Sequence, residues 1–190
     1  MKHIDLFDRI APLYALFYSY QRKGYQKSLD LLFKSQDFQF ESALDVGCGT
    51  GALTAELSNQ LKVVGLDGSK SMIRQAQRLS PSLTFIQQDV SQGLPYEDHS
   101  FDLVISAFVL HGLSELQRLN LLKEMKRVSS KAVILIDYHE GRHPLISLVE
   151  WIEHGDYFRF MDHFKDEIPL VFDQVMILKT NANAAFYILS

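Results

Sequence analysis

Residues 43–51 read Ala43-Leu44-Asp45-Val46-Gly47-Cys48-Gly49-Thr50-Gly51. An apolar, strand-like run leads here into three alternating glycines, and a segment with helical periodicity follows. Glycine permits a tight turn and lets a ligand approach bare backbone. The free N–H groups at the start of a helix add a partial positive charge. A loop of this kind predicts a binding site for a nucleotide-like ligand at the carboxyl end of a parallel strand.

The glycines alone leave two ligand classes open, because Gly47, Gly49 and Ala52 also satisfy the G-x-G-x-x-G/A pattern of dinucleotide binding. Asp45 favours the other class. A carboxylate at the end of an apolar strand is unfavourable unless it meets a cation or hydrogen-bond donors. The α-ammonium group of S-adenosylmethionine would supply the cation, whereas the pyrophosphate of NAD would be repelled. The alternative is that Asp45 only caps its own turn.

Outward from this loop, short apolar runs alternate with longer amphipathic ones, as in a parallel sheet with right-handed crossovers. The predicted strands are 43–46, 63–67, 83–87, 101–107, 132–137, 171–179 and 185–189, and the predicted helices are 52–60, 69–79 and 116–128. A short link over 180–183 predicts a hairpin, and so an antiparallel last strand. We therefore expect an α/β fold: a Rossmann-like, seven-stranded, mostly parallel sheet with helices on both faces.

The two segments outside this alternation are predicted to cover the site. Residues 1–35 have apolar side chains at helical spacing, with a break or a first-turn position expected near Pro12. The segment is too short to own a core, so we expect an N-terminal helical lid on a body over 39–190. A helical, aromatic-rich insert is expected at about 144–168. The whole chain, 1–190, is then a single domain.

Composition restricts the classes of partner. The 190 residues are 47% hydrophobic and carry a formal net charge of −4, so there is no broad basic field for nucleic acid. No apolar run approaches the length of a membrane span, and Asp5 stands where a signal peptide would begin its apolar core. A single cysteine, Cys48, excludes an internal disulfide. We expect a cytoplasmic monomer or homodimer that acts on a small-molecule substrate.

The string 44–51 resembles the first motif of the class I S-adenosylmethionine-dependent methyltransferases, and the similarity continues at the expected spacings to residue 137. The resemblance is to small-molecule enzymes, and it implies S-adenosylmethionine as cofactor and S-adenosylhomocysteine as product. The stretch 7–14 is also similar to the opening of ubiquinone/menaquinone C-methyltransferase relatives, although the chain departs from those enzymes after residue 106.

Asp67 ends a predicted strand about twenty residues beyond the glycine loop, where a carboxylate can accept both ribose hydroxyls. The resemblance implies that Met72 lies against the adenine, that Asp89 accepts from its amine, and that Tyr14 lies over the methionine part. For Met72 and Asp89 the alternatives are a core methionine and a solvated turn residue. The cofactor-binding candidates are Tyr14, Asp45, Gly47, Cys48, Gly49, Asp67, Gly68, Met72, Asp89, Val90 and Ser106.

His111 follows a predicted strand and resembles a histidine common in small-molecule methyltransferases. It is the catalytic candidate, as a base or as a group that orients an acceptor hydroxyl, with packing at a helix start as the alternative. The substrate-binding candidates are Tyr18, His111 and Tyr138. We predict no metal site, because no carboxylate completes a ligand set around His139 and His143.

The predicted function is methyl transfer from S-adenosylmethionine to a small, partly apolar metabolite by in-line displacement, in which the positioning of the acceptor lowers much of the barrier. Two alternatives remain. One is an NAD(P)-dependent oxidoreductase, which Asp45 and the absence of a Y-x-x-x-K pair oppose. The other is a catalytically silent module that binds an adenosyl ligand or a protein partner.

Overall fold

The structure is a computed structural model that describes residues 8, 11–12, 14–35, 39–139, 157–180 and 184–190. These residues form a seven-stranded sheet with the strand order β3-β2-β1-β4-β5-β7-β6. The strands are β1 (Ser42–Val46), β2 (Lys62–Asp67), β3 (Thr84–Gln87), β4 (Phe101–Ala107), β5 (Ser129–Tyr138), β6 (Val175–Lys179) and β7 (Ala184–Leu189). The first five strands pair in parallel, and β7 runs antiparallel to both β5 and β6. The predicted fold class is confirmed.

Strand β1 lies at the point where the chain reverses its direction of travel across the sheet. From β1 the chain crosses to β2 and β3 on one side, and then returns to β4 and β5 on the other. The connections that follow β1 and β4 therefore lead to opposite faces of the sheet. A crevice at this switch point is the usual ligand site of open α/β sheets.

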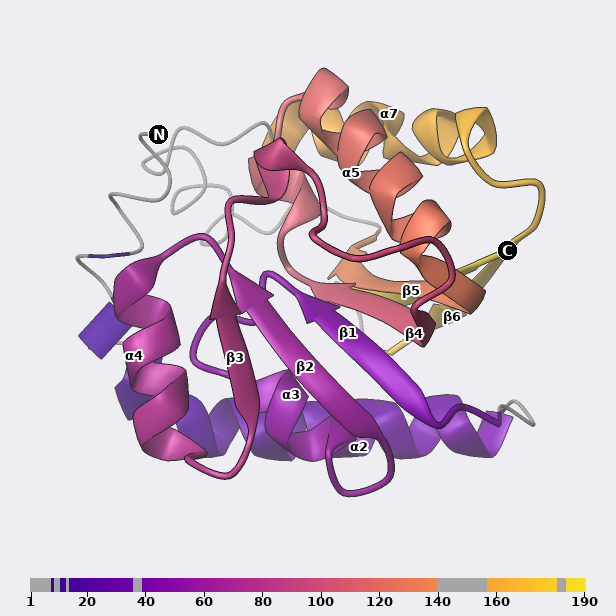
Figure 1. Ribbon diagram of the computed structural model, residues 1–190. Helices are drawn as coiled ribbons and strands as arrows, with labels where there is room; N and C mark the ends of the chain where they lie inside the picture. The colour runs from indigo at the N-terminus through magenta and orange to yellow at the C-terminus, as the bar shows by residue number, and fades with distance from the viewer. Residues whose placement is uncertain (1–7, 9–10, 13, 36–38, 140–156, 181–183) are drawn as a thin grey trace.

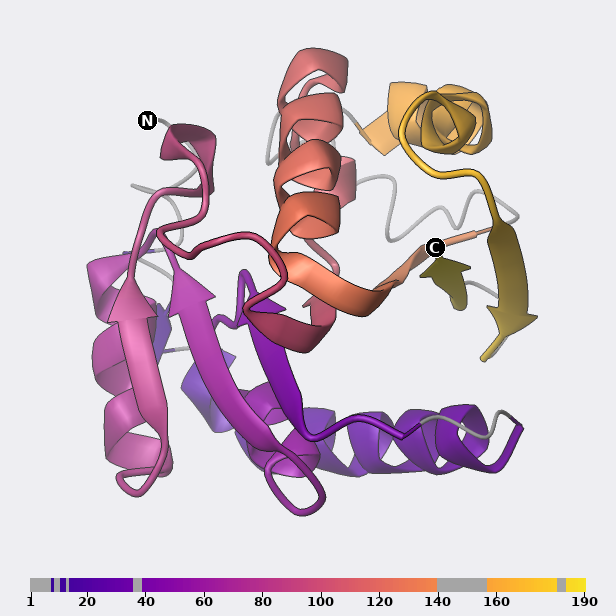
Figure 2. The ribbon, with the colours of Figure 1, turned by 45° about the vertical axis from the view of Figure 1, so that its right-hand side comes forward.

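Helices cover both faces of the sheet (Figures 1 and 2). Helices α2 (Tyr18–Ser35) and α3 (Ala52–Leu57) lie on one face, while α5 (Glu115–Val128) and α7 (Tyr157–Glu167) lie on the other. Helix α4 (Lys70–Leu79) packs beside β2 and β3. Three short 3-10 turns complete the described elements: η1 (Val90–Gln92), η2 (Leu110–Gly112) and η3 (Ile168–Leu170).

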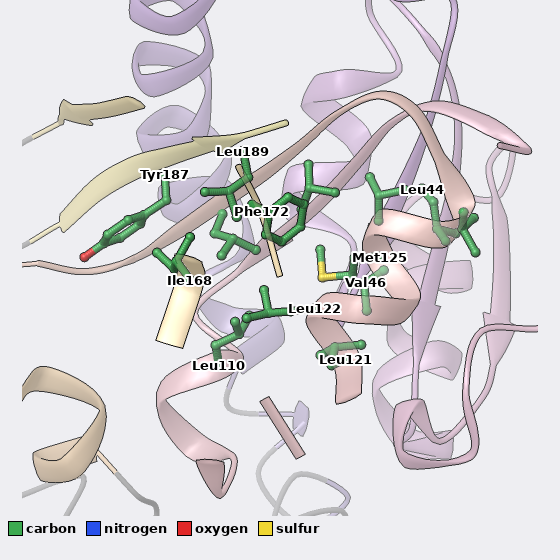
Figure 3. Packing of buried hydrophobic residues seen from close by; sticks show 14 of the residues in the cluster. Leu44, Val46, Leu110, Leu121, Leu122, Met125, Ile168, Phe172, Tyr187 and Leu189 are labelled. Carbon is green, nitrogen blue, oxygen red and sulfur yellow. The ribbon is translucent and has the colours of Figure 1, made fainter. Parts of the chain in front are cut away.

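The alternation of side chains along β1 separates two cores. Leu44 and Val46 join the larger cluster, which also contains side chains of α5, α7 and β7. Figure 3 shows labelled members of this cluster from β1, α5 and β7. Ala43 belongs to the cluster on the opposite face, beneath α2 and α3. Asp45 is two residues after Ala43 in the same strand, so its side chain points to the same face. Its carboxylate is therefore directed toward α3 and not toward solvent.

Helix α2 packs against the body of the fold, which gives its apolar side chains the partners that a segment too short to own a core requires. Leu29 and Leu32 are buried against the sheet with side chains of α3 and β4. In the chain before α2, Pro12 is helical, and a turn at Phe17 precedes α2.

Several element boundaries also differ from the predictions. Strand β6 begins at Val175, because Pro169 lies in the turn η3 and the chain enters the sheet only after it. Helix α3 ends at Leu57, ahead of the predicted residue 60. The helical insert is seen as α7, while the predicted residues 144–156 lie outside the described part of the chain. None of the helices in the described ranges is long and apolar enough to cross a membrane.

Candidate functional site

The glycine loop after β1 has the open backbone that the sequence predicts. Gly47 and Gly49 adopt positive φ values of 75° and 54°, a region that disfavours residues with a Cβ. A Cβ on Gly47 would lie 2.3 Å from Cγ2 of Val109, so only glycine lets the loop after β4 approach. A Cβ on Gly49 would have no atom within 4 Å. The Gly49 side of the loop therefore faces open space, where a ligand can contact the backbone.

Asp45 is a buried acid at the base of this loop. It is 1% exposed, and its Oδ2 accepts a hydrogen bond from Oγ1 of Thr54 at 2.6 Å. Among the described residues no cation pairs with it. Burial raises the pKa of Asp45 to about 7, and the charge of Asp67 acts in the same direction. A cationic group of a ligand would stabilise the ionised carboxylate here.

Asp67, at the carboxyl end of β2, holds the glycine loop against the start of α4. Its Oδ2 accepts from the amide of Gly49 at 2.8 Å, and its Oδ1 accepts from the amide of Ser69 at 2.8 Å. Burial raises the pKa of this carboxyl, while the hydrogen bonds from the two backbone amides lower it. Each carboxylate oxygen can accept a further hydrogen bond. Asp67 is therefore able to receive the two hydroxyls of a ribose.

Asp8, which the sequence analysis passed over, connects the N-terminal segment to the same place. Its Oδ1 accepts from Oγ of Ser69 and, at 2.9 Å, from the amide of Ser71. These hydrogen bonds lower the pKa of Asp8. Ser69 is the N-cap of α4, as its position after Gly68 predicts, since its Oγ accepts from the amide of Met72. The segment before α2 thus reaches the carboxyl edge of the sheet.

Tyr14 lies in that segment and is half-buried. Burial is the main cause of the raised pKa of the Tyr25 hydroxyl on α2, and the charges of Asp45, Tyr14 and Asp137 act in the same direction. Tyr14 therefore lies within electrostatic range of α2, and its place over the methionine part of the cofactor stays a prediction.

The residues proposed for the adenine separate into two groups. Asp89 and Val90 are half-buried beyond the end of β3, and Oδ1 of Asp89 caps η1 by accepting from the amide of Ser91 at 2.9 Å. Gly68, next to Asp67, is also at the carboxyl edge, where its carbonyl accepts from Gln87. Met72, in contrast, is 2% exposed and belongs to the core, which matches its alternative interpretation.

Three further candidates have structural partners instead. Tyr18 is buried, and its hydroxyl lies 2.6 Å from Oγ of Ser80 at the far end of α4, so it is not brought together with the other substrate candidates. Ser106 is 1% exposed and donates to the carbonyl of Val46, which ties β4 to β1. The side chain of Cys48 packs into a core cluster, so only its backbone can face a ligand. Burial raises the pKa of the Cys48 thiol, which makes it unreactive.

The ends of β4 and β5 bring together the remaining candidates. Nδ1 of His111 lies 2.8 Å from Oδ1 of Asp137, and the ring of His111 lies 4.8 Å from that of Tyr138. Phe108 contacts Tyr138 with ring centroids 5.4 Å apart and is 39% exposed. Its φ of 55° is unusual for a bulky residue and holds the backbone in a strained conformation, a feature concentrated at functional sites.

Sequence reasoning missed Asp137 and Phe108 as site residues. Asp137 was visible only as the last residue of a predicted strand, although an acid that ends an apolar strand is the same signal that singled out Asp45 and Asp67. No sequence pattern singled out Phe108, because its left-handed backbone depends on the hydrogen bond that its amide donates to the carbonyl of Ile136 on the neighbouring strand. Within the described residues, no three metal-ligating side chains lie close enough to hold a metal ion.

Known proteins are similar to this chain in sequence. A family model described as a methyltransferase domain matches residues 43–132. The chain is 33% identical over 178 residues to the demethylmenaquinone methyltransferase of Lactobacillus johnsonii, an alignment that covers 84% of this chain and 68% of that protein. It is 40% identical over 96 residues to the demethylmenaquinone methyltransferase of Oceanobacillus iheyensis, covering 46% of this chain and 40% of the relative. The matches thus span between 40% and 68% of the length of these two relatives.

The fold also has solved counterparts. The crystal structure of a SAM-dependent methyltransferase from Aquifex aeolicus matches with a TM-score of 0.58 at 21% identity, over 78% of this chain and 81% of that one. At this identity the likeness concerns the fold alone.

Proposed function

Because the chain belongs to the class I S-adenosylmethionine-dependent methyltransferases, we propose that it transfers the methyl group to a small, partly apolar acceptor by in-line displacement. The family's cofactor is S-adenosylmethionine, which supplies an electrophilic methyl group on a sulfonium when bound. The chain's own residues have to bind the two reactants, hold them in line and exclude water. Positioning of this kind can contribute on the order of 7–11 kcal/mol to lowering the barrier.

The observation that carries the proposal is the buried carboxylate of Asp45. A buried acid without a cationic partner among the described residues is unfavourable in the free protein. It becomes favourable when the α-ammonium group of the ligand lies beside it. The open side of Gly49 leaves room for such a ligand, and Asp67 can take the ribose hydroxyls one strand away.

The acceptor side supports a partly apolar molecule with one polar end. Phe108 and Tyr138 offer aromatic surface, and His111 lies beside Tyr138 as the polar group. We propose that the acceptor's ring or chain packs against the two aromatic side chains, with its acidic hydroxyl directed to His111 and its reacting atom directed to the methyl group. Since two relatives are named for demethylmenaquinone, that compound, in its reduced form, is the first acceptor to try.

Calorimetry with the purified protein tests the choice of ligand. We expect S-adenosylmethionine and S-adenosylhomocysteine to bind, with no measurable binding of NAD, because the pyrophosphate would meet the carboxylate of Asp45. Tight binding of NAD together with no binding of either adenosyl ligand would support the oxidoreductase instead and sink the proposal.

Turnover separates an enzyme from a silent binding module. The protein is incubated with methyl-labelled S-adenosylmethionine and a panel of small hydroxylated aromatic acceptors that begins with reduced demethylmenaquinone. We expect label in one of the acceptors. Adenosyl binding without transfer to any member of the panel would favour the silent module.

A further inference from the structure

The contact between His111 and Asp137 joins two elements that are distant in the sequence. Asp137 is next to last in β5 and 0% exposed, while His111 lies in η2, directly after β4, and is 8% exposed. Nδ1 of His111 is 2.8 Å from Oδ1 of Asp137, and the two residues are 26 positions apart. Only the pairing of β4 with β5 brings them together.

Both carboxylate oxygens of Asp137 accept hydrogen bonds from backbone amides. Oδ2 accepts from the amide of Leu110 at 3.1 Å, and Oδ1 accepts from the amide of Tyr138 at 2.8 Å. Backbone amides can only donate, so both oxygens of Asp137 act as acceptors here. The nitrogen of His111 that faces this carboxylate must then carry a proton. The geometry therefore selects the tautomer with hydrogen on Nδ1, which leaves Nε2 as the basic nitrogen.

We propose that Asp137 is a positioning residue that holds His111 in this tautomer, so that Nε2 takes a proton from the acceptor during methyl transfer; this inference rests on the proposed function. An electron pair of the acceptor would form the new bond to the methyl carbon while the bond from that carbon to sulfur breaks and its electrons stay on the sulfur; in a hydroquinone acceptor this pair comes from the ring that the hydroxyl group activates. The acceptor's proton passes to Nε2. The carboxylate of Asp137 then faces the resulting imidazolium and stabilises it until the proton is lost to water.

The surroundings of His111 favour this division of roles. The ring of Tyr138 lies 4.8 Å away and that of Phe160 6.3 Å away, so two aromatic side chains restrict the imidazole. The other buried charges of the described helices around η2 are Arg118 of α5 and Glu167 of α7, which pair with each other. Glu115 and Arg159 pair at the surface of the same two helices. Among these described groups, Asp137 is thus the charge that acts directly on His111.

The tautomer is measured by ¹⁵N NMR of the imidazole nitrogens in the free protein, at about pH 8 and without cofactor or acceptor. We expect a neutral ring with hydrogen on Nδ1 and an unprotonated Nε2. A ring with hydrogen on Nε2, or an imidazolium at that pH, would overturn the proposal, because neither has a basic Nε2. This spectrum does not depend on activity, so its outcome is separate from that of the turnover panel.

Variants extend the test to catalysis. In Asp137→Asn we expect His111 to lose its single tautomer and kcat with reduced demethylmenaquinone to fall about 10²- to 10⁴-fold, while the affinity for S-adenosylhomocysteine stays within about threefold. In a His111→Gln background the same change should have little further effect on kcat. An equally large loss in both backgrounds would contradict a role through His111.

Tyr187→Phe is the matched control. Tyr187 donates to the carbonyl of Tyr138 and lies 3.1 Å from a second buried histidine, His139. The change therefore removes buried hydrogen bonds at the same end of the sheet, without touching the contact between His111 and Asp137. We expect the NMR signals of His111 to stay as in the parent protein. Should Asp137→Asn fail to fold, the spectrum of the parent protein still decides the proposal.

Discussion

At the scale of single residues, Asp45 shows how a buried charge couples ligand binding to pH. Its pKa is raised to about 7, mainly by burial, against about 3.9 in an unfolded chain. Between these values the folded protein binds the proton more tightly than the unfolded chain. The contribution of Asp45 to stability is therefore fully present below about pH 4 and is lost as the pH rises through about 7.

Binding of the cofactor should have the opposite dependence on pH, because an ammonium group beside Asp45 favours the charged carboxylate. From about pH 6 to about pH 7.5 we expect the affinity for S-adenosylhomocysteine to rise roughly five- to tenfold as the free protein ionises. Calorimetry at constant ionic strength measures the change. Over this range the ligand's own amino group remains largely protonated.

Asp45→Asn provides the control for this linkage, since it keeps the shape of the side chain and removes the titration. The variant should bind more weakly, with an affinity that is nearly constant over the same range. If the parent protein and the variant showed the same slope, the dependence on pH would come from another group, and Asp45 would not face the ammonium.

At the scale of elements, α5 and α7 are joined by a buried ion pair and by an exposed one. Nε and Nη2 of Arg118 donate to the two oxygens of Glu167, and both residues are buried, at 0% and 4% exposed. Glu115 and Arg159 connect the same helices, but their side chains are 46% and 62% exposed. The two pairs allow burial to be compared within one helix contact.

Glu167→Gln should lower the free energy of unfolding by about 3–5 kcal/mol, because it removes the charge of Glu167 from its buried contact with the guanidinium of Arg118. Glu115→Gln should cost less than about 1 kcal/mol, since solvent screens the exposed pair. Urea denaturation followed by circular dichroism measures both changes. Similar losses in the two variants would show that burial does not set the strength of these contacts.

At the scale of the whole molecule, the N-terminal part divides between two tasks. Helix α2 is built into the core through Leu29 and Leu32, whereas Asp8 fastens the preceding segment to the start of α4. We propose that the segment before α2, with Tyr14, covers the bound cofactor. The covering part is thus shorter than the lid over 1–35 that the sequence predicts.

Hydrogen exchange with and without S-adenosylhomocysteine tests this division. Peptides over 8–16 should exchange more slowly when the ligand is bound, because the ligand lies between this segment and the sheet. Peptides over 22–35 should be protected equally in both states, since α2 packs on the sheet with or without ligand. No change over 8–16 would leave the segment a static part of the fold.

Asp8→Ala supplies the matched variant for the same measurement. It removes the acceptor for Ser69 and Ser71, so exchange over 8–16 should become faster in the free protein, while 22–35 stays unchanged. Faster exchange over both ranges would mean that the two parts unfold as one unit.

The sequence alone determined the order of the elements, the direction of the strands and the glycine loop. These features depend on patterns between near neighbours: the period of the apolar side chains, the helix cap at Ser69 and the backbone freedom of Gly47 and Gly49. The acids at the ends of β1 and β2 also stood out, because an acid is conspicuous at the end of an apolar strand. The boundaries of β6 and α3 were less certain, because tertiary packing decides where an element ends.

Only the tertiary structure decided which side chains meet. Tyr18 and Ser106 have hydroxyl groups that could serve a binding site. The hydroxyl of Tyr18, however, hydrogen-bonds a residue 62 positions away, and that of Ser106 a residue 60 positions away, and the sequence indicates neither partner. Asp137 acquires its neighbour His111 only when β4 and β5 pair. The physical reason is that periodicity and backbone hydrogen bonding act between near neighbours along the chain, whereas contacts across the sheet depend on how whole faces pack.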